Sequence, residues 1–274
     1  MTVFPGRRRI VALAMLVAIA SATALLALAT LRSEGFDYQD PFDPLPSPGA
    51  RGTGTEVDGA PDSDRELDAF LAFVFSDAQR FWEGTLERSG VDYMPATLTV
   101  FHGTLVTACG PASAAVGPFY CPLDHTVYLD AGFFRRLAVE LRAPGDFAQA
   151  YVIAHEVGHH VQNVTGVLAQ VMEAIVAGEG DRNELSIRLE LQADCLAGVW
   201  GRSTYERDML ERGDLDEALR ATAAVGDDRI QQKTTGRIDP ETWTHGSSQQ
   251  RRTWWLRGYT AGDPDSCDTF SGNA

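Results

Sequence analysis

The chain has 274 residues, 44% of them hydrophobic, so it is long and apolar enough to form one medium-sized domain with a real core. Its net charge of −15 is uneven, because four of the 23 basic residues precede position 33 and no acidic residue precedes Glu34. Such an acidic surface repels phosphate backbones, which argues against nucleic acid as a partner.

The N-terminal segment has the pattern of a membrane anchor. Residues 10–31 carry no charge, and a helix of this length, at ~1.5 Å per residue, spans a hydrocarbon core of roughly 30 Å. Three arginines at 7–9 favour a cytoplasmic position for residues 1–9, which places the rest of the chain in the periplasm or outside the cell. The alternative is a signal peptide cleaved near residues 27–29, although such peptides have an apolar core of roughly 7–15 residues. We expect an uncleaved, single-pass anchor in the cell membrane.

Residues 32–63 predict a linker. Ten of the thirty residues from 35 to 64 are Gly or Pro, and four prolines nearly alternate between positions 41 and 48. Such a stretch buries too little apolar surface to fold and forms a semi-stiff tether. The folded domain is therefore expected to occupy residues 64–274.

Four cysteines lie on the side of the anchor that we expect to be exported. An even number in an oxidising compartment predicts two disulfides, and the chain has no C-x-x-C pair for a cysteine zinc site. Three pairings are possible. The short, turn-rich stretch between Cys109 and Cys121 favours that pair, which leaves Cys195 to pair with Cys267.

The domain has the pattern of an α+β fold. A helix is predicted to begin at Asp64 and to stop at Gly90, and short β-rich segments are predicted early in the domain. The further helices are expected at 132–142, 147–165, 184–200 and 215–225, and the strands at 97–101, 119–121 and 126–129. Because the last two strands flank a turn at 122–125, they predict a hairpin. We expect a mostly helical domain with a small β-sheet.

The helix predicted at 147–165 contains an H-E-x-x-H motif. His155 and His159 are four residues apart, so both imidazoles project from one face and reach a single ion at ~2.0–2.1 Å. Glu156 is rotated by about 100° around the helix axis relative to His155. This position is suited to taking a proton from metal-bound water. His160 faces elsewhere and is interpreted as a packing or hydrogen-bonding residue. The apolar neighbours favour an ion here, because buried polar groups without partners are costly.

A second helix supplies the third ligand that a catalytic zinc site requires. Glu190 and Asp194 are four residues apart on a mostly apolar segment, in which Ala193 and Ala197 indicate close helix packing. We predict Glu190 as the ligand and Asp194 as the acceptor for a histidine N–H. A solvated acidic stripe is the alternative. If Glu190 is not the ligand, the next candidates are Glu173, Glu184 and His245.

Five segments resemble the bacterial neutral zinc metallopeptidase family. They are "GPFYCPLDHTVYLD", "HEVGHHVQNVTG", "ELQADCLAGVW", "VGDDRIQ" and "THGSSQQRRTWWLRGY", in this order over roughly residues 70–270. Members of that family resemble gluzincins and often carry an N-terminal membrane segment. The resemblance implies a zincin-like fold and proteolysis, with His155, His159 and Glu190 as zinc ligands and Glu156 as the base. One departure is a serine at 247, where the family pattern has threonine.

Three further residues are weaker candidates. His245 immediately precedes a predicted helix that begins with Gly246 and two serines, and it is either a donor to the oxyanion or a buried structural histidine. Tyr128 lies in a segment, 127–129, that alternates like an edge strand able to hold an extended peptide. His125 lies in the turn before that segment.

The sequence as a whole predicts a membrane-anchored, zinc-dependent peptidase that hydrolyses peptide bonds by Glu156-assisted attack of water. Two other hypotheses remain. The first is a non-catalytic binding module in which a metal only locks two helices together. The second is a different hydrolase, for instance one that acts on cell-wall peptides.

Overall fold

The computed structural model describes residues 64–271 apart from 114–115. Within this part of the chain no helix is both long and apolar enough to cross a membrane. The expected anchor at 10–31 and the expected linker at 32–63 lie outside the described residues.

The described part is mostly helical with a small amount of sheet, which confirms the predicted α+β class. The α-helices are α2 (Asp64–Arg88), α3 (Ala131–Val139), α4 (Asp146–Val164), α5 (Val167–Ala177), α6 (Arg182–Glu206), α7 (Asp214–Ala224), α8 (Asp227–Thr234) and α9 (Ser248–Ala261). Two short 3-10 helices are η1 (Pro240–Thr242) and η2 (Pro264–Cys267). The predictions missed α5 and α8 and made α6 too short.

Two small sheets precede most of the helices. The strands are β1 (Thr97–Phe101), β2 (Thr104–Thr107), β3 (Gly110–Ser113), β4 (Phe119–Cys121) and β5 (Thr126–Asp130). The first sheet has the order β1-β5-β4, with β1 parallel and β4 antiparallel to β5. The predicted β4–β5 hairpin is therefore confirmed, but the prediction that residues 127–129 form an edge strand is wrong. All five residues of β5 are buried, because the strand has a neighbour on each side. The hairpin β2–β3 was not predicted.

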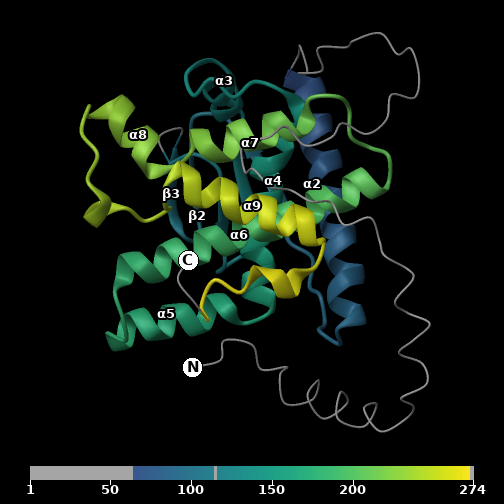
Figure 1. Ribbon diagram of the computed structural model, residues 1–274. Helices are drawn as coiled ribbons and strands as arrows, with labels where there is room; N and C mark the ends of the chain where they lie inside the picture. The colour runs from purple at the N-terminus through teal and green to yellow at the C-terminus, as the bar shows by residue number, and fades with distance from the viewer. Residues whose placement is uncertain (1–63, 114–115, 272–274) are drawn as a thin grey trace, which may run out of the picture. The chain divides into compact units, whose positions relative to one another are not determined.

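Helix α4 is the central element of the helical part, in contact with α2, α6, α7 and β4 (Figure 1). Fifteen of its 19 residues are buried, which explains the long apolar pattern in its sequence. The helix begins at Asp146, with Gly145 in the capping position. Asp146 is its first residue, one position before the predicted start at 147.

Small residues allow α6 to approach both α4 and α9 closely. A Cβ atom on Gly158 of α4 would lie 3.0 Å from the carbonyl oxygen of Ala193 in α6. A Cβ atom on Gly258 of α9 would lie 1.9 Å from the carbonyl oxygen of Cys195, on the other side of α6. Figure 1 shows α9 lying against α6, although 57 residues separate their facing side chains Asp194 and Arg251. Close packing therefore brings residues of three helices within hydrogen-bonding reach.

Both predicted disulfides are present. Cys109–Cys121 connects the β2–β3 turn to β4, and its Cys121 end packs in a small core with Phe101 and Tyr128. Cys195–Cys267 joins the middle of α6 to η2, so the last described residues are fastened to the helix that carries Glu190.

Candidate active site

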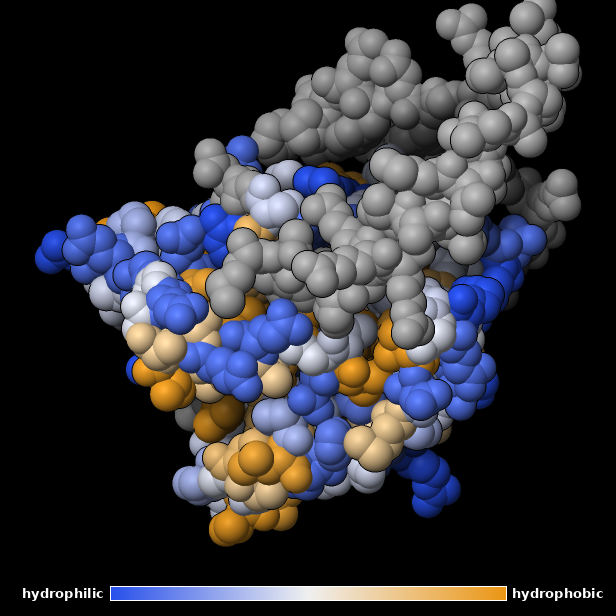
Figure 2. Space-filling model, turned by 90° about the horizontal axis from the view of Figure 1, so that it is seen from below, coloured by the Kyte–Doolittle hydropathy of each residue, from blue (hydrophilic) through white to orange (hydrophobic). Residues whose placement is uncertain are grey.

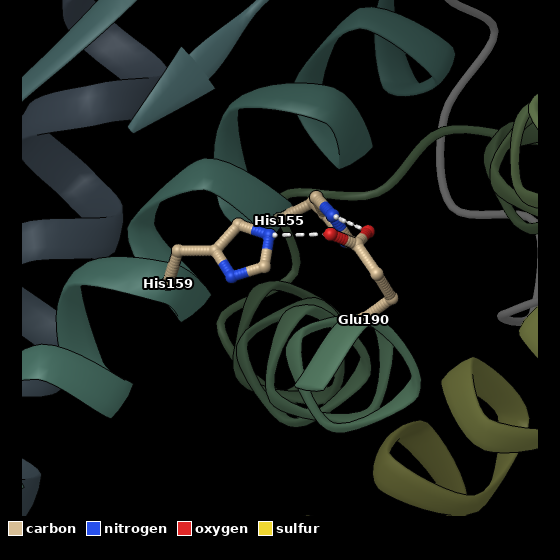
Figure 3. A group of neighbouring side chains, drawn as sticks. All are labelled: His155, His159 and Glu190. Atoms are coloured by element: carbon tan, nitrogen blue, oxygen red, sulfur yellow. Dashed lines mark hydrogen bonds and ion pairs between the residues drawn. The ribbon is translucent and has the colours of Figure 1, made fainter. Parts of the chain in front are cut away.

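Three potential metal ligands from two helices converge at one point. His155 and His159 project from α4 toward Glu190 on α6, as Figure 3 shows. The Nε2 atom of His155 lies 3.1 Å from Glu190 Oε2, and that of His159 lies 3.4 Å from Oε1. Ligand atoms bound tetrahedrally to one zinc ion at ~2.0–2.1 Å are about 3.3–3.4 Å apart. Two imidazoles and one carboxylate therefore fit Zn²⁺ both in chemistry and in spacing.

The second nitrogen of each imidazole is held by an acceptor. His155 Nδ1 lies 2.9 Å from Asp194 Oδ1, and His159 Nδ1 lies 2.8 Å from Gln162 Oε1. The amide nitrogen of Gln162 donates in turn to the carbonyl of Leu189 at 2.7 Å, which fixes the orientation of the amide. Hydrogen bonds of this kind select the tautomer in which Nε2 faces the metal. The role predicted for Asp194 agrees with this geometry, whereas Gln162 was not predicted.

Asp194 is fully buried and belongs to an ion pair inside the protein. Arg251 of α9 donates to both of its oxygens, at 2.7 and 3.0 Å, and the Tyr151 hydroxyl donates at 2.6 Å. Burial opposes ionisation of Asp194, but Arg251 and His155 outweigh it and lower the pKa of the carboxyl group. Burial also opposes protonation of His155, yet the two neighbouring carboxylates raise its pKa to about 10. The electrostatic potential around the His155 imidazole is thus strongly negative.

Glu156 lies at the wall of the cleft beside the three potential ligands and is 7% exposed. Among the described residues no hydrogen-bond donor reaches its carboxylate, so the group remains open to a water molecule in the cleft. Burial, with a contribution from Glu190, raises the pKa of Glu156 despite the two nearby histidines. A carboxylate with a raised pKa is a stronger base, which suits it to accept a proton.

His245 lines the same cleft, and its side chain is half-exposed. The carboxylate of Asp227, at the start of α8, lies 3.2 Å from its Nδ1 and also accepts the backbone N–H groups of Thr244, His245 and Gly246. The hydrogen bond to Asp227 raises the pKa of His245, although burial opposes the change. The segment before α9 is therefore fixed by Asp227, with the imidazole presented to the cleft.

Helix α9 begins as the sequence indicates. The Ser247 hydroxyl accepts from the Gln250 N–H at 3.1 Å, and the Gln250 side chain accepts from the Ser247 N–H at 3.0 Å, which makes a capping box.

The other candidate residues lie elsewhere. His160 is fully buried, and its two ring nitrogens bond to the Tyr120 hydroxyl and the Met94 carbonyl, in agreement with the predicted structural role. Tyr128 donates to Asp124 at 2.8 Å, and neither it nor His125 lines the cleft. Two of the alternative ligands, Glu173 and Glu184, are exposed and do not belong to the converging group.

The three potential ligands and Glu156 open into a cleft of about 600 Å³. It extends along β4 and the loop before it on one side, and along α5 and the middle of α6 on another. A volume of this size is typical of sites that bind small molecules or several residues of a peptide.

Four residues that support the site were not predicted: Tyr151, Gln162, Asp227 and Arg251. Gln162 had a usable signal, since an amide three residues after His159 in a buried helix needs a partner. Arg251 had none, because it stands in a polar run, Q-Q-R-R, that is typical of a solvated face.

Comparison with known proteins gives a consistent result. The family described as "Putative neutral zinc metallopeptidase" matches residues 43–270. The uncharacterised protein YpfJ of Escherichia coli K12 is 47% identical over 206 residues, which cover 75% of this chain and 72% of YpfJ. The uncharacterised protein Rv2575 of Mycobacterium tuberculosis is 50% identical over 190 residues, covering 65% of this chain and 64% of that protein. No solved structure matches the chain.

Proposed function

Since the chain belongs to the neutral zinc metallopeptidase family, we propose that it is a zinc-dependent peptidase with His155, His159 and Glu190 as the metal ligands. The observation that carries this proposal is the convergence of both Nε2 atoms on one carboxylate, with both Nδ1 atoms already held by acceptors. When bound, zinc supplies the charge that polarises the scissile carbonyl and lowers the pKa of water toward ~7. The arrangement is that of a zincin-like site.

Glu156 is the proposed general base. Its carboxylate faces the cleft beside the ligands, has no donor among the described residues, and has a raised pKa. It accepts a proton from the attacking water and passes that proton to the leaving amine. A group with this basicity suits both halves of the transfer.

His245 is the proposed donor to the oxyanion. Its imidazole lines the cleft, and the Asp227 carboxylate at Nδ1 favours the protonated, donating form. A fixed donor aimed at the developing negative charge stabilises the transition state more than the substrate. Asp227 acts here as a positioning residue for His245.

The substrate backbone is proposed to lie along β4. This strand is at an edge of the sheet β1-β5-β4, and its residues Phe119 and Tyr120 line the cleft. An edge strand offers unpaired backbone groups that hold an extended peptide by β-strand addition. This assigns to β4 the role that the sequence suggested for residues 127–129.

The test of catalysis is Glu156→Gln in the full-length protein. We expect the variant to bind one zinc and to fold like the parent, but to lose peptide cleavage by a factor of about 10² or more. Glu173→Gln is the matched control, since Glu173 is an exposed glutamate of α5 outside the converging group, and it should cleave normally. If Glu156→Gln cleaves as fast as the control, the metal has a structural role and the chain is a non-catalytic module.

The test of the ligand set is metal analysis of Glu190→Ala. We expect the parent to hold one zinc per chain and the variant to lose most of it on dialysis. Retention of a full equivalent by the variant would move the third ligand to another residue.

We also propose that residues 10–31 anchor the protein and that the peptidase domain lies outside the cytoplasm. The two disulfides of the domain support an oxidising compartment. The test is thiol alkylation in intact cells, with and without prior reduction, followed by fractionation. Membrane-associated protein with no free thiol is expected, and soluble protein with four reactive thiols would contradict the assignment.

A further inference from the structure

The wall of the cleft is uncharged outside the catalytic cluster. The ionisable groups that line it, apart from two tyrosines, are His155, His159, Glu156, Glu190, His245 and Arg251. All the other described residues on the wall are apolar or neutral, and the largest are Phe119, Phe133, Leu168, Met172, Leu189 and Ile230. Any substrate side chain beyond the reacting bond therefore meets an apolar surface.

The charged residues of the cluster are already engaged. Glu190 is a proposed zinc ligand and Glu156 the proposed base, so neither is free to pair with the ammonium group of a peptide N-terminus. The guanidinium of Arg251 is directed at Asp194, Tyr151 and the carbonyl of Val225, and its side chain is 4% exposed. It is therefore not available to a peptide C-terminus. The imidazole of His245 has the Asp227 carboxylate at its Nδ1 and is the proposed donor to the oxyanion, so it is engaged as well. Enzymes that trim chain ends need such a charged partner for the terminus, because an unpaired charge is costly to desolvate.

From these two observations, and on the basis of the proposed peptidase function, we propose that the protein is an endopeptidase that cleaves internal bonds next to bulky apolar side chains. An apolar side chain gains free energy when it leaves water for this wall. A charged side chain loses its hydration there and finds no partner. Blocking the ends of a peptide should not change its rate of cleavage, since the cleft has no free charged group to pair with a terminus.

One apolar face of α5 lies partly inside the cleft and partly outside it. Leu168 and Met172, one turn apart, line the cleft, and Met172 is 49% exposed. Val176, one turn further, is 85% exposed and does not line the cleft. Figure 2 views the molecule from below and shows separate apolar patches between polar groups on this face. Met172 is thus placed to contact a substrate residue, and Val176 is its matched control.

The first experiment is a cleavage profile of the full-length, zinc-loaded protein. Two peptide libraries are digested, one with free ends and one with acetylated N-termini and amidated C-termini, and the products are identified by mass spectrometry. We expect internal cleavage of both libraries at similar rates. Leu, Phe, Met or Ile should be enriched at a position next to the cleaved bond, by about tenfold over Asp, Glu, Lys and Arg.

The second experiment introduces a charge into the wall. Met172→Glu should lower kcat/KM for the best apolar peptide and raise it for the same peptide with Lys at the selected position. The ratio of the two values should fall by about tenfold, which is the change expected when a burial-driven contact is replaced by an unpaired carboxylate. Val176→Glu, which adds the same charge one turn away, should leave the ratio within about twofold of the parent.

The outcomes separate this proposal from the peptidase function itself. Trimming of the free library alone, or cleavage without regard to charge, would overturn the proposal and leave a zinc peptidase. If Met172→Glu and Val176→Glu change the ratio of kcat/KM values equally, Met172 makes no specific contact with the substrate, and the argument from the wall is overturned. If neither library is cleaved under conditions in which zinc is bound, the peptidase function fails as well.

Discussion

The buried ion pair between Asp194 and Arg251 allows a sharp test of how the site is held together. The pair has two hydrogen bonds, of 2.7 and 3.0 Å, and its side chains are 0% and 4% exposed. Arg251→Met keeps most of the apolar stem but leaves the Asp194 carboxylate buried without a cation. Breaking a buried pair in this way costs about 3–5 kcal/mol, because the remaining charge cannot return to water.

The matched control is an exposed ion pair on α6, the helix that carries Asp194. Arg202 and Glu206 of α6 lie 2.9 Å apart, but their side chains are 36% and 59% exposed. Arg202→Met should therefore cost at most about 1 kcal/mol. In a domain of this size 1 kcal/mol shifts Tm by about 2–4 °C, so Arg251→Met should lower Tm by about 6–20 °C and Arg202→Met by 4 °C at most.

A double-mutant cycle identifies the cause of the loss. Asp194→Asn removes the charge but keeps an oxygen for His155, so the double variant contains neither unpaired ion. Its loss of stability should be smaller than the sum of the two single losses by about 2 kcal/mol or more. Thermal unfolding of the zinc-loaded proteins gives all four values. Additive losses, or an Arg251→Met variant as stable as Arg202→Met, would refute the reasoning.

Two further predictions concern packing and pH. Gly258→Ala should destabilise the protein by about 1–3 kcal/mol, since the new Cβ would lie 1.9 Å from the Cys195 carbonyl oxygen. Gly84→Ala should stabilise α2 by up to about 1 kcal/mol, because the nearest atom to its Cβ, in the Arg88 side chain, is 3.4 Å away. Thermal unfolding measures both changes, and equal effects would contradict close packing of α6 against α9. Burial and two neighbouring carboxyl groups raise the pKa of Glu217 to about 7, so its ionisation lowers stability as pH rises from about 4.5, its ordinary value, to 7. Glu217→Gln should therefore raise Tm at pH 8 and leave it unchanged at pH 4, and the same gain at both pH values would show that the charge is irrelevant.

The helices of the site were predictable because their burial leaves a regular trace in the sequence. The H-E-x-x-H motif lies in a helix that is buried on nearly all sides. Glu190 and Asp194 are the two charged residues in the apolar stretch 189–201 of another helix. The four cysteines were predictable as pairs, because one pair is close in sequence and the other two are what remains.

Contacts between distant elements left no such trace. Arg251 is polar within a polar run, and only the approach of α9 to α6 shows that its partner is Asp194, 57 residues earlier. Strand order was not predictable either, because the alternation of residues 126–130 fits an edge strand as well as a central one. Only the structure shows that β5 has neighbours on both sides. The short α5 was missed although its sequence is apolar, because it has only 11 residues and only Val167 and Val171 among them are buried.

The sum of the charges at the site explains why so many ionisable groups can be buried next to one another. Three carboxylates meet there: Glu156 is 7% exposed, the Glu190 side chain is 17% exposed and Asp194 is fully buried. Among the described residues that line the cleft, Arg251 supplies the one guanidinium. With neutral imidazoles, these four groups sum to two negative charges. A dication at the point where the ligands converge cancels that charge, which a monovalent ion does not. The raised pKa of His155 has the same cause, since the surrounding carboxylates also stabilise a proton on that ring.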